Sequence, residues 1–305
     1  MTRRRVAALT VLVIVLGALG WAAVAAVGGG NSKPKTQLQT TSSSLIYTTE
    51  TVTTNGKETT TVVAMPKPFR VVFPEGFTLR QMAERVGAVA KIAEHERRVK
   101  PLLSRPGYLA AARRAGSPAC FRRERSLEGF LFPATYEFFA KTTNAQLVND
   151  QLSAFCENWR QVNLAYARSK NLTPYDVLII ASMVEKETLS PDERPLVAAV
   201  IYNRLHKRMP LGIDATLRYG LDIPPTQSIT ESELASPSPY NTRNRLGLPP
   251  TPIASPGLAS MQAAAHPAHV DYLYFVRKPD KKHHFFTASF AAFQHYEATH
   301  GYTPH

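Results

Sequence analysis

Cysteine is scarce in this sequence, and the short motifs of the common cofactor enzymes are missing. The 305 residues include two cysteines, Cys120 and Cys156, which are too few for a disulfide framework or a zinc knuckle. They could form one bridge in an oxidising compartment, a point that the sequence alone leaves open. There is no phosphate-binding loop, no Gly-x-Gly-x-x-Gly fingerprint and no Gly-x-Ser-x-Gly elbow. We therefore expect a protein that uses no cofactor.

A metal site is not expected either. The histidines of the C-terminal part are His266, His269, His283, His284 and His295. The first two lack the i,i+4 spacing that places two ligands on one helix face, and no carboxylate motif accompanies them.

Negative charge is in short supply as well. The chain has 36 Lys and Arg against 23 Asp and Glu, a formal net charge of +13. That balance favours anionic surroundings, such as nucleic acid, a membrane surface or a wall polymer. Residues 90–125 are strongly basic and helical in pattern. Lipid headgroups and anionic wall polymers are natural partners for this stretch, and a solvated basic face is the simpler alternative.

The N-terminus narrows the choice of partner. Three arginines in residues 1–5 precede residues 6–27, which are 22 residues without a charge, and about 20 apolar residues span a bilayer core. A cleavable signal peptide is the alternative, but its apolar region is usually shorter. We predict a cytoplasmic tail (1–5) and a single-pass anchor in the cell membrane (6–27), with the rest extracytoplasmic. This placement argues against nucleic acid as a partner.

The remaining chain reads as a linker followed by folded parts. Residues 28–68 are rich in Thr and Ser, and β-branched runs on both sides of Asn55-Gly56 predict a hairpin. A disordered stalk is the alternative. We predict a small mixed subdomain over 69–140 and a larger domain over 141–305. The expected fold class is α+β, with helices around short strands. The segments with clear patterns are strands at 69–73 and 272–276 and helices at 79–86, 144–170, 174–189 and 258–265.

Two glutamates at the end of an apolar helix are the first candidates for chemistry. The predicted helix starts at the Thr173-Pro174 signal, and a capping box from Ser190 to Glu193 begins the next helix. Glu185 and Glu187 are two residues apart, so they point about 200° away from each other and do not form a carboxylate pair. Glu187 continues the apolar stripe at a helix C-terminus. Both features raise a carboxyl pKa and favour a general acid.

A solvated Glu-Lys-Glu face is the common alternative for such a triplet. Downstream loops favour the functional interpretation because they are rich in Tyr, Asn, Thr and Pro, which suit sugar binding. These loops are 214–220, 238–244 and 247–257. They would serve equally well as rigid structural turns.

Many ordered blocks of this sequence resemble the YceG-like endolytic murein transglycosylases. The blocks are Glu128-Gly-Phe-Leu-Phe-Pro-Ala-Thr-Tyr136, Ala181-Ser-Met-Val-Glu-Lys-Glu-Thr188, Glu193-Arg194, Val200-Ile-Tyr-Asn-Arg-Leu205, Met209, Asp214-Ala-Thr216, Tyr219-Gly220, Tyr240-Asn-Thr242, Gly247-Leu-Pro-Pro250, Ile253-Ala-Ser-Pro-Gly257, Ala263-Ala-Ala-His-Pro267 and Tyr272-Leu-Tyr-Phe-Val276. The similarity runs in order from about residue 69 to 293, and the family also carries a membrane anchor.

The resemblance implies a lytic cut at the MurNAc-β-1,4-GlcNAc bond of nascent peptidoglycan. The product would end in 1,6-anhydro-MurNAc, and peptidoglycan synthases would be partner proteins. The family's catalytic acid matches Glu187. By hypothesis, the groove is lined by Asp214, Thr216, Tyr240, Asn241 and Thr242, and a supporting shell comprises Glu185, Arg194, Asn203 and Arg204. A structural role for Asn203 and Arg204 is the alternative.

The chain departs from the family in one respect, and two other functions compete. Family members commonly carry a LysM-like module where residues 29–68 stand here. A hydrolase would use Asp214 or Glu185 to activate water and would leave a reducing end. A non-catalytic, membrane-tethered wall-binding or division scaffold would need no acid at all.

Overall fold

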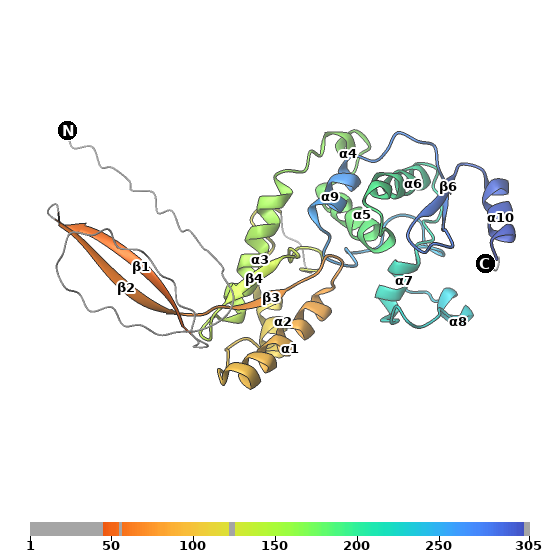
Figure 1. Ribbon diagram of the computed structural model, residues 1–305. Coiled ribbons are helices and arrows are strands. Elements are labelled where there is room, and N and C mark those ends of the chain that lie inside the picture. The colour runs from red at the N-terminus through yellow and green to blue at the C-terminus, as the bar shows by residue number, and fades with distance from the viewer. Residues whose placement is uncertain (1–44, 55–56, 122–125, 302–305) are drawn as a thin grey trace, which may run out of the picture. The chain divides into compact units, whose positions relative to one another are not determined.

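The structure, a computed structural model, describes residues 45–54, 57–121 and 126–301 (Figure 1). The chain divides into two compact units, residues 1–68 and 69–305. The predicted tail and anchor lie outside the described residues. Within the described ranges, no helix has both the length and the apolar character needed to cross a membrane. The predicted boundary between residues 140 and 141 stays a prediction.

The first unit contains a long antiparallel hairpin. Strands β1 (Leu45–Thr54) and β2 (Lys57–Pro66) pair along their whole length, from Leu45 opposite Pro66 to Thr54 opposite Lys57. This register confirms the hairpin that the β-branched runs predicted.

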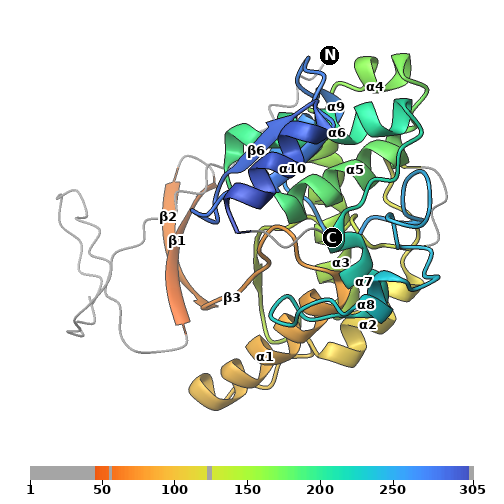
Figure 2. The same cartoon turned by 90° about the vertical axis from the view of Figure 1, so that its right-hand side faces the viewer.

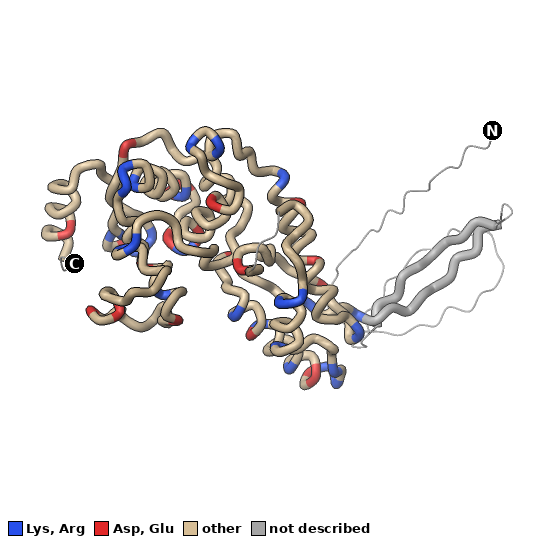
Figure 3. Tube along the Cα trace, turned by 180° about the vertical axis from the view of Figure 1, so that it is seen from behind, with Lys and Arg blue, Asp and Glu red and all other residues tan. Residues whose placement is uncertain are grey.

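The second unit begins with a two-stranded sheet and two helices. β3 (Phe69–Val72) pairs antiparallel with β4 (Thr135–Phe138), and between them lie α1 (Leu79–Arg97) and α2 (Arg105–Arg114). Thr78 caps α1 in a capping box, and the helix begins at Leu79 as predicted but runs to Arg97 instead of ending at residue 86. Figure 3 shows acidic residues among the basic ones along α1.

The helix predicted over 144–170 is in fact two helices, α3 (Asn144–Trp159) and α4 (Ala165–Ser169). The break has a local cause. The Asn163 side chain accepts the Ala165 amide N–H at 2.9 Å, and such a turn competes with helical hydrogen bonding. The structure also joins Cys120 to Cys156 of α3 in a disulfide, which settles the pairing that the sequence left open.

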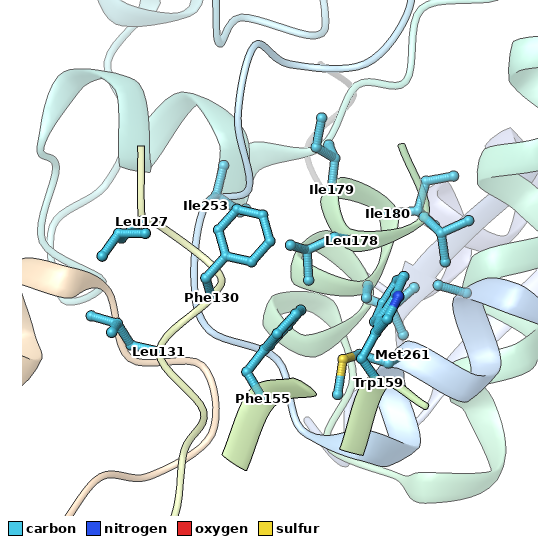
Figure 4. Packing of buried hydrophobic residues seen from close by; sticks show 14 of the residues in the cluster. Leu127, Phe130, Leu131, Phe155, Trp159, Leu178, Ile179, Ile180, Ile253 and Met261 are labelled. Atoms are coloured by element: carbon cyan, nitrogen blue, oxygen red, sulfur yellow. The ribbon is translucent and has the colours of Figure 1, made fainter. Parts of the chain in front are cut away.

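The core of this unit surrounds α5 (Pro174–Glu187). This helix starts at Thr173 in a capping box, and its residues 177–184 are all buried. It packs against α6 (Arg194–His206) and α9 (Leu258–Ala265), and the three lie side by side in Figure 2. Figure 4 shows Phe130 next to Ile253 and near Leu178 of α5. The core therefore joins the segment around Phe130 to the central helices.

Three segments differ from their predicted form. The polar stretch 214–220, predicted as a loop, is helix α7 (Asp214–Leu221), followed by the short α8 (Glu231–Leu234). Residues 190–193 form a 3₁₀ turn (Pro191–Glu193) without the predicted capping box. The strand predicted at 272–276 is shifted to β5 (Tyr274–Arg277), which is half-buried and pairs with β6 (His284–Thr287) ahead of α10 (Phe290–Thr299). The described part of the chain is thus a mixed α+β fold.

Candidate active site

Glu187 is the last residue of α5, so the buried body of this helix fixes its position. Its side chain is partly exposed and accepts a hydrogen bond from the backbone N–H of Ala215, in the first turn of α7. Burial and the nearby charge of Asp214 raise the pKa of Glu187 to about 7, although Arg277 and Lys186 oppose the shift. A carboxyl with this pKa can both donate and accept a proton near neutral pH.

Asp214 lies beside Glu187 and is held by an arginine. Arg243 donates to one Asp214 oxygen from Nη2 at 2.6 Å and from Nε at 3.2 Å. Both side chains are partly exposed. Arg243 was not among the residues singled out from the sequence, where it stands as one of many arginines.

Glu185 faces a different part of the protein. Its Oε2 accepts the Gly257 N–H at 3.0 Å, at the start of α9, and its neighbour Lys186 donates to the Gly76 carbonyl at 3.3 Å. Glu185 and Glu187 thus bind separate elements, as their spacing predicted. The supporting role expected of Glu185 stays a prediction.

Three residues expected to line a glycan groove are buried and bonded within the protein. Thr242 accepts the Ile213 N–H at 3.0 Å and lies 3.0 Å from the Thr216 hydroxyl. Asn241 donates to the carbonyls of Leu234 and Ser236. Thr216 and Thr242 thus hold the residue before α7, and Asn241 holds the end of α8 and the chain after it. The predicted contact of the three side chains with glycan stays a prediction.

For Tyr240 the predicted contact with glycan also stays a prediction. Tyr240 is half-buried, its hydroxyl lies 2.8 Å from the Thr251 hydroxyl, and its ring centroid is 5.1 Å from that of Tyr219 in an edge-to-face arrangement. Gly220 allows this approach, since an added Cβ there would come within 2.5 Å of Tyr240 Cβ.

The predicted supporting residues of α6 mostly hold the chain that follows α9. Arg194 donates to Ser260 at 3.1 Å. Asn203 donates to the Val270 and Tyr272 carbonyls, each at 2.9 Å. Arg204 binds the Leu273, Pro210 and Leu211 carbonyls. For Asn203 and Arg204, the structural alternative is therefore the one that the contacts favour.

Sequence reasoning missed two buried acids. Glu193 accepts from the backbone N–H of His284 at 2.8 Å and lies 2.7 Å from its Nδ1, so it fixes the start of β6. Glu128 accepts from Leu79 N–H and Tyr219 O–H. Burial raises the pKa of Glu128 to about 7, against these hydrogen bonds. Both acids stood inside the blocks quoted above, but their partners are distant in sequence.

Sequence comparisons show which known proteins this chain resembles. A family model described as YceG-like family matches residues 38–299. An endolytic murein transglycosylase of Streptococcus pneumoniae is 34% identical over 227 residues, which cover 68% of this chain and 40% of the relative. One from Bacillus subtilis is 36% identical over 152 residues, covering 50% of this chain and 42% of the relative. The matched segments thus span only about two fifths of these relatives.

A solved structure agrees with the sequence comparisons. The crystal structure of a yceG-like protein from Listeria monocytogenes superposes with a TM-score of 0.62 at 28% identity, covering 75% of this chain and 76% of that one. The family match covers far more than half of the sequence and includes the glutamate at the end of α5. This chain belongs to the YceG-like family.

Proposed function

We propose that this protein is an endolytic lytic transglycosylase of peptidoglycan. The observation that carries the proposal is Glu187, a partly exposed carboxyl at the end of a buried helix with a pKa of about 7. The names of the relatives from S. pneumoniae and B. subtilis support the same activity. The substrate would be the MurNAc-β-1,4-GlcNAc bond within a glycan strand.

One acid is enough for this reaction. Protonated Glu187 gives its proton to the glycosidic oxygen as the bond to MurNAc C1 breaks. The carboxylate then takes the proton of the MurNAc C6 hydroxyl, and that oxygen bonds to C1 to close the 1,6-anhydro ring. The proton count returns to its start and no water is consumed, so a second carboxylate is unnecessary, unlike in most glycoside hydrolases.

A hydrolase remains the alternative enzyme, with Asp214 as the group that would activate water. Asp214 is close enough to Glu187 to raise its pKa. However, the ion pair with Arg243 engages one of its oxygens, so that oxygen is not free to take a proton from water. Glu185 is a weaker candidate base because its carboxylate is bonded to the start of α9.

The test uses the purified full chain and uncrosslinked glycan strands, with products analysed by mass spectrometry. We expect internal cuts that end in anhydro-MurNAc, reduced at least 100-fold in Glu187→Gln. Products heavier by one water would identify a hydrolase, and Asp214→Asn would then be tested. If the wild-type chain binds strands but never cuts them, a non-catalytic scaffold would replace the proposal.

The same proposal covers the location of the protein. We infer a single-pass anchor at residues 6–27 and a site on the outer face of the cell membrane, where nascent strands and their synthases are found. The Cys120–Cys156 bridge supports an oxidising, exported environment. Addition of protease to intact cells should remove the folded unit if it is exported, whereas protection of that unit would contradict the proposed location.

A further inference from the structure

Glu128 is a buried acid that the proposed reaction does not use. Glu128 is 5% exposed. Among the described residues it takes part in no ion pair within 4.0 Å. Its carboxylate instead joins two helices. Oε1 accepts the N–H of Leu79, the first residue of α1, at 3.0 Å, and Oε2 accepts the hydroxyl of Tyr219, in α7, at 3.1 Å.

The backbone that carries Glu128 has little freedom to move. Leu127, Phe130 and Leu131 around it are core residues. Gly129 has a φ of +87°, and an added Cβ there would lie 2.6 Å from Pro252 Cβ. The carboxylate is therefore a fixed point against which a neighbouring helix can be aligned.

Helix α7 connects this fixed point to Glu187. Its first turn supplies the Ala215 N–H to the Glu187 carboxylate, and its last turn carries Tyr219. Thr242 holds the start of the helix through the Ile213 N–H. Glu128 holds the other end through Tyr219, whose ring also packs against Tyr240. Two side chains thus fix the two ends of one short helix.

We propose that Glu128 is a positioning residue: through Tyr219, it aligns α7 so that the Ala215 N–H and Asp214 keep their places beside Glu187. The inference rests on the proposed function for its kinetic consequence. Its structural consequence, the alignment of the Ala215 N–H on Glu187, can be measured without any cleavage.

The chemistry of the contact shows which substitutions test it. Both partners of Glu128 are donors, so in the carboxylate form both of its oxygens accept hydrogen bonds. Gln offers one acceptor and places an NH₂ against the remaining donor. Tyr219→Phe removes the hydroxyl that links Glu128 to α7 and also interacts with Thr251, leaves the Leu79 contact and changes no charge. A matched control is Arg70→Gln, because the exposed ion pair of Arg70 in β3 with Glu137 in β4 involves neither α7 nor Glu128.

The kinetic experiment is a double-mutant cycle on glycan strands with the full chain. We expect Glu128→Gln and Tyr219→Phe each to lower kcat about tenfold or more with a smaller change in KM, because the perturbed group is Glu187 rather than the groove. The double variant should be no slower than the worse single variant. Arg70→Gln should retain kcat within about twofold.

The second readout is the titration of Glu187, followed by NMR of ¹³C-labelled glutamate in wild type and Tyr219→Phe. The Ala215 hydrogen bond lowers the pKa of Glu187, so its loss should raise that pKa, while Asp214, Arg277 and Lys186 are still present. An unchanged titration, or kinetic effects that simply multiply in the double variant, would overturn the proposal. Loss of thermal stability with unchanged kcat would reduce Glu128 to a purely structural role. A wild type without cleavage would refute the proposed function, and the titration would still decide this inference.

Discussion

At the scale of single residues, the raised pKa that suits Glu187 to acid catalysis should also lower the free energy of unfolding. Burial and Asp214 raise its pKa to about 7 from an ordinary value of 4.5. Below about pH 4.5 the carboxyl is protonated in both the folded and the unfolded chain, so its ionisation does not lower the free energy of unfolding. As the pH rises toward 7, the unfolded chain loses this proton more readily than the folded one. The contribution of Glu187 to the free energy of unfolding therefore falls between about pH 4.5 and 7 and stays low above that.

Glu187→Gln should consequently stabilise the protein at high pH. We expect a gain of about 1 to 3 kcal/mol near pH 8 and little gain near pH 4.5, because the amide cannot ionise. Urea unfolding at several pH values measures the difference. An equal gain at all pH values would show that packing, and not ionisation, causes it.

The sequence predicted the catalytic candidate but not the roles of several polar neighbours. Glu187 could be found because helical spacing and the dipole of α5 depend on local sequence alone. Local sequence could not decide whether Thr216, Asn241 and Thr242 bind a ligand or support the fold. A hydroxyl or amide looks the same whether it meets a sugar or, as here, a backbone group across a turn.

At the scale of elements, α1, α3 and α5 begin where the sequence predicted. Thr78, Thr143 and Thr173 all cap helices through capping boxes. Helix α7 was missed because Ile213 precedes it without any side-chain cap. Its position comes instead from Thr242 and Glu128, which are distant in the sequence. Contacts of this kind leave no local pattern.

The loop that carries Glu128 gives a sharper test of such long-range packing. Gly129→Ala would place a Cβ within 2.6 Å of Pro252 at a φ of +87°. We expect it to lower the free energy of unfolding by about 2 to 4 kcal/mol, from backbone strain and overpacking together. Chemical denaturation would show the loss.

Gly116→Ala is the matched control. An added Cβ there meets no heavy atom within 4 Å, and the φ of Gly116 is not positive. It should change stability by no more than about 0.5 kcal/mol. If both substitutions cost the same, the contact between the Gly129 loop and Pro252 would not be the cause.

At the scale of the whole molecule, one covalent link crosses between distant parts of the folded unit. The cysteines are 36 residues apart, and their bridge ties Cys120, beyond α2, to α3. Closing a loop of this length restricts the unfolded chain, which in the loop-entropy estimate stabilises the fold by about 2 to 4 kcal/mol. Between the two ends lies the segment that carries Glu128, so the bridge limits how far that segment can separate from α3.

Removing the bridge should therefore destabilise the folded unit without touching the groups around Glu187. We expect Cys120→Ala/Cys156→Ala to lower the free energy of unfolding by about 2 to 4 kcal/mol. Reductant should lower it similarly in the wild type and have no effect on the double variant. Cleavage at a temperature where both proteins are folded should stay within about twofold, since neither cysteine contacts the site. A large loss of cleavage with intact stability would instead mean that the bridge holds the Glu128 segment in register with α7.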